Sequence, residues 1–220
     1  RPHGRCAGAV NWRAKAMSLF LLGLVRLLTG AQARWYGCPP KAEQRIYFAN
    51  HQSHADLVMI WAALPQELRS ITRPIAARDY WTKTPLKQWI TTRVFNAVYV
   101  ERARPKGEEG ANEPDPLAPL VEALDSGDSI IIFPEGTRGH AEEPQPFKSG
   151  LYSLALKFPN VVLVPAWIDN VQRVMPKGEV VPVPILCSVT FGAPLQLQEG
   201  EERRAFLDRA RLAVIALRDV

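Results

Sequence analysis

The sequence predicts a single α/β domain, with a mostly parallel or mixed central sheet flanked by helices. Short apolar runs typical of buried strands alternate along the chain with segments that repeat apolar residues at helical spacing. This alternation is the pattern of a sheet covered by helices on both faces. A length of 220 residues suits one large domain with a full core. The main domain of the sequence shows neither an internal repeat nor a second domain boundary.

Strands are predicted where β-branched and aromatic residues form short runs bounded by turn residues. In chain order these are residues 45–50, 97–100, 129–133, 161–168 and 185–191. Helices are predicted at residues 57–64, 81–94, 117–124, 151–158 and 201–217. Pro65 ends the first of these helices. Residues 103–116 carry Gly, Pro and both charge signs without an apolar anchor, which predicts an exposed, mobile loop.

Residues 1–34 are predicted to form a basic and apolar, membrane-associating segment ahead of the main domain at 35–220. Within this segment, residues 16–31 are apolar except for Arg26. As a helix they would be about 24 Å long at ~1.5 Å per residue, short of the roughly 30 Å hydrocarbon core of a bilayer. Three interpretations stay open: an interfacial or half-inserted helix, a core helix, and a signal peptide cleaved near Ala31-Gln32-Ala33.

The net charge of +5 and the isoelectric point near 9.3 favour an anionic partner, such as a membrane surface or a phosphorylated substrate. The sequence has no nucleic-acid-binding signature and no zinc-ligand spacing, so neither nucleic acid nor a metal is expected. Cys6, Cys38 and Cys187 are odd in number and widely spaced, which argues against a disulfide framework and fits a reducing compartment. Met17, just after a basic run, is a candidate natural start.

Three residues with titratable or charged side chains follow directly after predicted strands. They are His51, Arg102 and Glu135. In α/β sheets, binding and catalytic residues gather in the loops after the carboxyl ends of strands. These positions therefore predict one shared site.

His51 and Asp56 offer a base and a carboxylate five positions apart. In one continuous helix this offset would turn the side chains away from each other. They meet only if His51 lies in a strand-to-helix loop and Asp56 begins the helix. Asp56 would then accept the Nδ1–H of the imidazole and leave Nε2 facing a substrate hydroxyl. The alternatives are that Asp56 only caps a helix, and that His54 is the base.

Phe133-Pro134-Glu135-Gly136-Thr137-Arg138 ends a predicted strand with a glycine turn that suits an anion. Gly136 lets a ligand approach the backbone, and the side chains of Thr137 and Arg138 bind oxyanions. Glu135 is expected either to orient Arg138 or to hold the polar head of an acceptor. Lys148 would add a further cation. The competing interpretation is an ordinary turn with a surface salt bridge.

Together these strings resemble the glycerolipid acyltransferases, typified by bacterial 1-acylglycerol-3-phosphate acyltransferase. Asn50-His51 followed by Asp56 resembles the first motif of that family, and residues 133–138 look like the third. Arg102 lies where the second motif is expected, and Val164-Pro165 corresponds to the fourth. Without the resemblance, Pro165 would be expected to shape a sheet edge. The agreement covers roughly residues 45–170.

One departure concerns the second motif. The family usually has a glycine several residues before the arginine of this motif, whereas this chain has Asn96 and Ala97.

The resemblance implies a reaction without an acyl-enzyme, in which His51, held by Asp56, deprotonates the hydroxyl of a lysophospholipid such as 1-acylglycerol-3-phosphate. The resulting oxygen would attack the thioester of acyl-CoA or acyl-carrier protein, with no metal or redox cofactor. Arg102, Glu135, Gly136 and Arg138 would position the phosphate of the acceptor.

Membrane lipids are then expected partners, at the cytoplasmic face of the inner membrane, with peripheral or monotopic attachment. Other lysolipid acceptors, including a lyso-amino-acid lipid, stay open. So do a thioesterase and a non-catalytic lipid-binding module.

Overall fold

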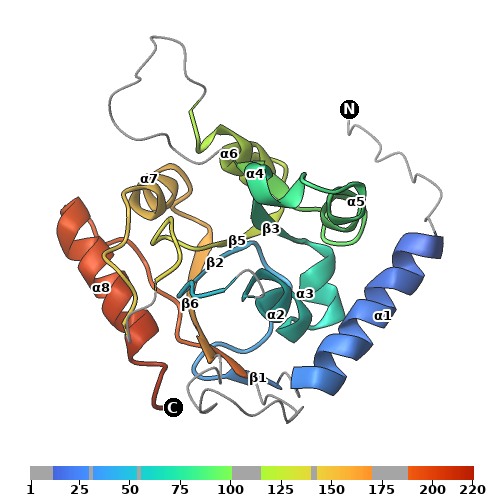
Figure 1. Ribbon diagram of the computed structural model, residues 1–220. Coiled ribbons are helices and arrows are strands. Elements are labelled where there is room, and N and C mark those ends of the chain that lie inside the picture. The colour runs from blue at the N-terminus through green and yellow to red at the C-terminus, as the bar shows by residue number, and fades with distance from the viewer. Residues whose placement is uncertain (1–11, 30–31, 54–55, 101–114, 140–142, 170–187) are drawn as a thin grey trace.

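A computed structural model describes residues 12–29, 32–53, 56–100, 115–139, 143–169 and 188–220. It confirms a single α/β domain with a mixed central sheet flanked by helices (Figure 1). Within these residues the sheet has seven strands in the order β1-β7-β6-β2-β5-β3-β4. The strands are β1 (Gln32–Trp35), β2 (Arg45–Ala49), β3 (Thr72–Ala77), β4 (Val98–Val100), β5 (Ser129–Ile132), β6 (Val162–Asp169) and β7 (Ser188–Phe191).

The sheet is mixed because one of its edges runs in the opposite direction. β6, β2, β5, β3 and β4 run parallel to one another, β7 pairs antiparallel with β6, and β1 pairs parallel with β7. β2 and β5 are direct neighbours, with Phe48 opposite Ile132 in their last paired positions. The loops that follow these two strands therefore leave the sheet side by side.

Helices cover both faces of the sheet, as the alternating pattern predicts. One face carries α1 (Trp12–Thr29), α2 (Asp56–Ala63), α3 (Gln66–Ser70), α4 (Arg78–Trp81) and α5 (Pro85–Arg93). The other carries α6 (Ala118–Asp125), α7 (Gly150–Lys157) and α8 (Arg203–Ile215). Tyr47 and Ala49 of β2 pack in the first core, whereas Ile46 and Phe48 pack in the second. This alternation follows from the two-residue period of a strand.

The single helix predicted at residues 81–94 is wrong, because the structure has two short helices here. α4 ends at Trp81 and α5 begins at Pro85. The side chain of Thr84 accepts a hydrogen bond from the backbone N–H of Lys87, so Thr84 caps the start of α5. A proline in the first turn with a threonine cap marks a helix start, and this signal outweighs the continuous apolar spacing.

Strand β3 was not predicted, because Pro74 argues against a central strand. Its residues 72–74 pair with β5, and the pairing with β4 begins at Ile75. Pro165 of β6 lies at a comparable point: it pairs with Phe48 of β2, and the ladder with β7 begins at Ala166. β6 lies inside the sheet, so the expectation that Pro165 shapes an edge is wrong. Pro74 is the last residue that pairs with β5 and Pro165 directly precedes the ladder with β7, where its carbonyl accepts the N–H of Gly192 at 2.9 Å.

Helix α1 packs on the domain through part of its surface. Leu22 is buried in the core that α2 also lines, whereas Trp12, Leu19 and Phe20 are 71%, 64% and 62% exposed. Within the described part of the chain, no helix is both long and apolar enough to cross a membrane. β1 spans residues 32–35, so the expected boundary after residue 34 falls inside a strand of the sheet.

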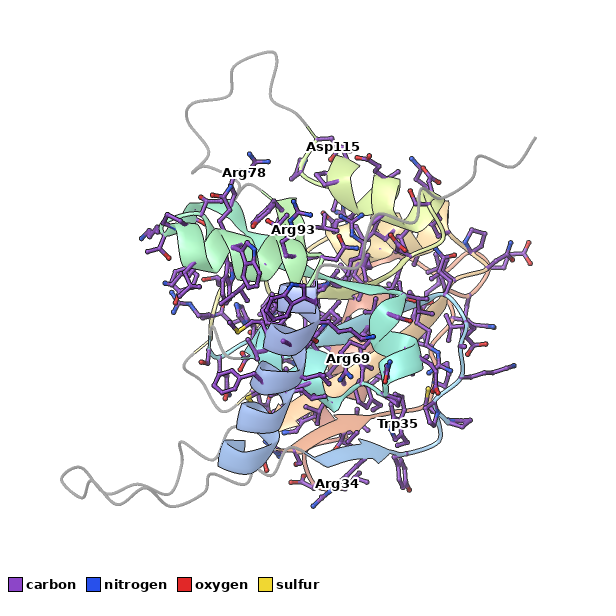
Figure 2. All side chains as sticks on the ribbon, turned by 90° about the vertical axis from the view of Figure 1, so that its right-hand side faces the viewer. Arg34, Trp35, Arg69, Arg78, Arg93 and Asp115 are labelled. Carbon is purple, nitrogen blue, oxygen red and sulfur yellow. The ribbon has the colours of Figure 1, made fainter. Side chains whose placement is uncertain are left out.

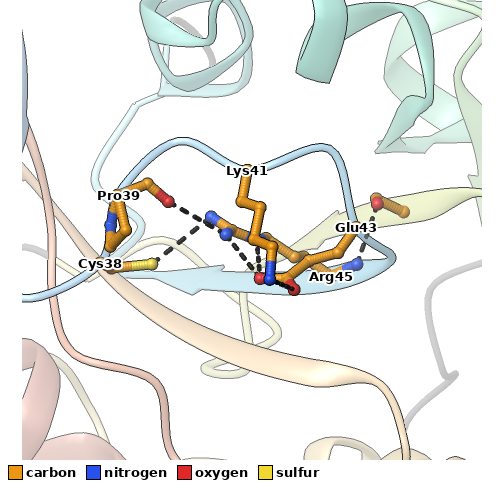
Figure 3. Close-up of polar contacts among 6 residues, drawn as sticks. Cys38, Pro39, Lys41, Glu43 and Arg45 are labelled. Atoms are coloured by element: carbon orange, nitrogen blue, oxygen red, sulfur yellow. Dashed lines mark hydrogen bonds and ion pairs between the residues drawn. The ribbon is translucent and has the colours of Figure 1, made fainter.

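A buried polar cluster fixes the start of β2 (Figure 3). The guanidinium of Arg45 is enclosed, and it donates to Glu43 at 2.6 Å, to the Pro39 carbonyl at 3.0 Å and to the Cys38 sulfur at 3.4 Å. Burial raises the pKa of the Cys38 thiol, although Arg45 opposes this effect. Cys38 is therefore a buried thiol that packs against Arg45 and does not have the lowered pKa of a reactive cysteine.

Candidate active site

His51 and Asp56 lie in the geometry that their spacing requires. β2 ends at Ala49 and α2 begins at Asp56, so His51 stands in the connecting loop. The Nδ1 of His51 lies 3.0 Å from Oδ2 of Asp56. The contact between base and carboxylate expected from the sequence is therefore present.

The carboxylate of Asp56 is fully buried, and its Oδ2 also accepts the backbone N–H groups of Gln52 and Ser53, both at 2.7 Å. The loop thus folds around one oxygen. Because that oxygen already accepts two backbone donors, it is placed to accept from an imidazole Nδ1–H as well, which would leave Nε2 as the acceptor of the neutral ring. The His51 side chain is 19% exposed, so a substrate can approach the ring.

Phe133 holds the plane of the imidazole. Its ring stacks on that of His51, with 4.3 Å between the centroids and 19° between the planes. Phe133 follows β5 directly, and β5 is the neighbour of β2. The ring that stacks on His51 therefore comes from the segment at residues 133–138.

Glu135 differs from its expected role as an acceptor contact or a partner of Arg138. The residue is only 2% exposed. Its Oε1 accepts the backbone N–H of His51 at 2.8 Å, and its Oε2 accepts the N–H of Gln145 at 2.8 Å. Burial raises the pKa of the Glu135 carboxyl, while these hydrogen bonds act in the opposite direction. The carboxylate thus contacts backbone inside the fold.

Gly136, Thr137 and Arg138 are exposed on the turn that follows Glu135. Gly136 has a φ of +68°, and the Nζ of Lys148 lies 2.6 Å from the position that a Cβ on Gly136 would occupy. The backbone N–H of Lys148 donates to the Pro134 carbonyl at 2.8 Å, which holds the lysine beside the turn. An exposed glycine turn with a lysine across it suits an anion.

The same turn is bonded to the loop of the base. The N–H of Gly139, next to Arg138, donates to the His51 carbonyl at 2.8 Å. The basic residues of the turn and the imidazole therefore belong to one local structure, which comes from two strings about 80 residues apart.

Comparison with known proteins assigns the family. The sequence profile of the family described as Acyltransferase matches residues 38–169, which is more than half of the chain. The chain belongs to this acyltransferase family.

Curated relatives of this acyltransferase-family protein are named 1-acyl-sn-glycerol-3-phosphate acyltransferase. The chain is 28% identical over 133 residues to the chloroplastic relative BAT2 of Brassica napus, and the match covers 60% of this chain and 35% of the relative. It is 25% identical over 210 residues to the 1-acyl-sn-glycerol-3-phosphate acyltransferase alpha of Ovis aries, covering 92% of this chain and 68% of the relative. The chain thus spans about a third of the chloroplastic relative's length and about two thirds of the sheep relative's.

The fold is shared with a solved structure. The crystal structure of the 1-acyl-sn-glycerophosphate acyltransferase PlsC from Thermotoga maritima has a TM-score of 0.65 and 23% sequence identity to this acyltransferase-family protein. The likeness covers 96% of this chain and 80% of the PlsC chain. It therefore extends over nearly the whole fold described above.

Two of the residues considered from the sequence, Arg102 and His54, lie outside the described residues. β4 ends at Val100, and β4 is separated from β2 by β5 and β3 in the sheet. The catalytic and binding roles of the other residues remain predictions, and the geometry of Glu135 differs from its expected role as described above.

Sequence reasoning gave no role to Asn50, although it is part of the first string. Its side chain is buried and pairs with the backbone of Ile168 in both directions, at 3.0 Å from Nδ2 to the carbonyl oxygen and at 2.7 Å from N–H to Oδ1. This pair ties the end of β2 to β6 directly before His51. The only signal in the sequence was an amide side chain at the end of a buried strand.

Proposed function

We propose that this protein transfers a fatty acyl group from a thioester donor to the free hydroxyl of a lysophospholipid, and that 1-acylglycerol-3-phosphate is the acceptor. The observation that carries this proposal is the His51–Asp56 pair bonded to a turn that presents Arg138 and Lys148. A base alone suits many reactions, whereas a base joined to a cationic turn suits an alcohol that carries a phosphate. The names of the relatives point to the same substrate.

The proposed reaction proceeds without an acyl-enzyme. Nε2 of His51 takes the proton of the acceptor hydroxyl, and the hydroxyl oxygen attacks the thioester carbonyl. The C–O bond forms, the C–S bond breaks, and the imidazolium returns its proton to the leaving sulfur. Asp56 stabilises the imidazolium between these two steps, because its carboxylate is already aligned with Nδ1. The products are a diacyl phospholipid and a free thiol.

The acceptor phosphate is proposed to lie on the exposed turn. Arg138 can bind two phosphate oxygens through parallel N–H groups, and Lys148 adds a point charge. Gly136 has no side chain and so leaves room for the Lys148 side chain beside the turn, and Thr137 adds a hydroxyl. Arg102 is proposed as a further cationic contact. Acyl-CoA and acyl-carrier protein are both proposed donors, since both are acidic and the chain carries a net charge of +5.

Release of free thiol from palmitoyl-CoA, with and without 1-acylglycerol-3-phosphate, tests this function. We expect release that rises at least tenfold when the acceptor is added, together with formation of phosphatidate. Release that does not depend on the acceptor would identify a thioesterase. A lack of release with CoA and carrier-protein donors, combined with saturable lipid binding, would support a binding module.

We also propose that α1 attaches the protein peripherally to a membrane, at the cytoplasmic face. Figure 2 shows α1 across the front of the molecule, with Arg78 and Arg93 labelled on the part that carries α4 and α5. α1 exposes Leu19 and Phe20, and α5 exposes Leu86 next to Lys87, which is half-buried. Apolar side chains gain about 1.5–3 kcal/mol each when fully buried, and a basic residue gains about 1 kcal/mol at an anionic surface.

Co-sedimentation with vesicles of anionic and neutral lipids tests this attachment. The double substitution Leu19→Ser and Phe20→Ser is expected to weaken binding to anionic vesicles at least tenfold. Its matched control is Leu156→Ser with Leu212→Ser, because these leucines are 56% and 61% exposed on α7 and α8, on the other face of the sheet. Equal losses for the two double variants would argue against a role specific to α1.

A further inference from the structure

The turn after β5 forms hydrogen bonds with both the N–H and the carbonyl of His51. The His51 N–H donates to Oε1 of Glu135, and the His51 carbonyl accepts the N–H of Gly139, each at 2.8 Å. The donor and the acceptor of one residue are thus both engaged by residues 135–139. Apart from its side chain, His51 is held by the same turn that presents Arg138.

We propose that Glu135 is a positioning residue, which connects the acceptor turn to the His51 loop and does not contact the acceptor. This inference rests on the proposed function of the site. The carboxylate is almost fully enclosed and uses one oxygen for each of two backbone donors. Its contacts therefore fix where His51 stands relative to Arg138.

The cost of burying this carboxylate supports a specific role. Burial raises the pKa of Glu135, so the enclosed environment disfavours its charged form. Hydrogen bonds from the N–H groups of His51 and Gln145 offset that cost, because charge-assisted bonds are stronger than neutral ones. A neutral side chain with one acceptor would fill the same space with less desolvation. What the carboxylate adds is the ability to accept two donors at once.

Gly139 makes this arrangement possible. A Cβ at residue 139 would lie 3.2 Å from Oε2 of Glu135 and 3.9 Å from the His51 carbonyl oxygen. The first distance is shorter than an ordinary van der Waals contact, so a larger residue would displace the carboxylate. The glycine at 139 therefore lets the Glu135 carboxylate lie close to the backbone of the turn.

Glu135→Gln is the sharpest test, because glutamine keeps the shape and offers only one acceptor oxygen. One of the two backbone donors then faces an NH₂ group. We expect kcat to fall about tenfold, while the KM for 1-acylglycerol-3-phosphate changes less than about twofold. Glu122→Gln on the exposed side of α6 is the matched control and should leave both parameters unchanged. An acceptor KM that rises at unchanged kcat would overturn the proposal, since it would show direct acceptor binding.

A second readout does not require turnover. The chain has four histidines, and selective ¹⁵N labelling with His51→Ala as reference identifies the signals of His51. The wild type should show the Nδ1-protonated form, and Glu135→Gln should shift the ring nitrogens of His51 while the Glu122→Gln signals stay in place. Unshifted signals would overturn the proposal even if the wild type proves to act on another substrate. Failure of the function and failure of the positioning role are therefore distinguishable.

Gly139→Ala keeps the test decisive if Glu135→Gln does not fold. Alanine adds a single methyl group that pushes on Oε2 of Glu135. We expect a smaller fall in kcat, about threefold, with a shift of the His51 ring nitrogens in the same direction. An unchanged kcat together with unshifted ring nitrogens would overturn the coupling.

Discussion

His51→Ala is expected to lower acyl transfer about a thousandfold while the protein stays folded. General bases contribute roughly 10²–10⁴ to the rates of their reactions. Folding should survive, because Asp56 keeps its two backbone donors and the backbone bonds of residue 51 do not involve its side chain. The measurement is acceptor-dependent thiol release, with circular dichroism and a thermal melt on the same sample.

The control for this prediction is His54→Ala, which removes the other candidate base. That variant should keep most of the wild-type rate. If His51→Ala retains turnover and His54→Ala loses it, the base has been assigned to the wrong histidine. Loss of the fold in His51→Ala would be visible in the melt, and His51→Asn would then replace it.

Arg138→Ala is expected to lower kcat/KM for 1-acylglycerol-3-phosphate about a hundredfold. A hydrogen bond to a charged group contributes about 1.5–3 kcal/mol, and about 1.4 kcal/mol corresponds to a tenfold change. The KM for the acyl donor should change less than about threefold, because the proposed contact is with the acceptor phosphate. Steady-state kinetics with each substrate varied in turn measures both quantities.

Arg204→Ala on α8 provides the matched control. The Arg204 side chain is 93% exposed and, among the described residues, forms a 4.0 Å ion pair with Asp208 of the same helix, so its loss should change neither parameter more than twofold. Equal losses for acceptor and donor in Arg138→Ala would refute a contact with the acceptor phosphate. They would indicate a general disturbance of the turn.

The fold was predictable where local signals agree with the tertiary structure. The buried runs of β2, β5 and β6 and the amphipathic α8 were found within a few residues of their bounds. β3 was missed because Pro74 is compatible with a strand only when the strand changes partners beside it, and partners are set by residues far away in the sequence. The short β1 also lacked a strong local signal, since its four residues include polar Gln32 and Arg34.

The candidate site divides in the same way. The contact between His51 and Asp56 depends on five residues of local backbone, so the turn of a helix and the end of a strand were enough to predict it. The inward orientation of Glu135 was not predictable. It depends on a hydrogen bond to a residue 84 positions earlier and on burial by the packed turn. An acid beside an arginine suggests an ion pair, and only the three-dimensional arrangement shows that its partners are backbone N–H groups.

The two hydrogen bonds to the backbone of His51 have a consequence for protein engineering. To change the acceptor preference, residues 136–138 would be exchanged for the corresponding segment of another acyltransferase, because these residues carry the exposed groups. The residues on either side, Glu135 and Gly139, support the histidine. A chimera that exchanges the exposed residues and keeps this pair should retain its rate with a new preference. One that alters the pair should be slow with every lipid offered.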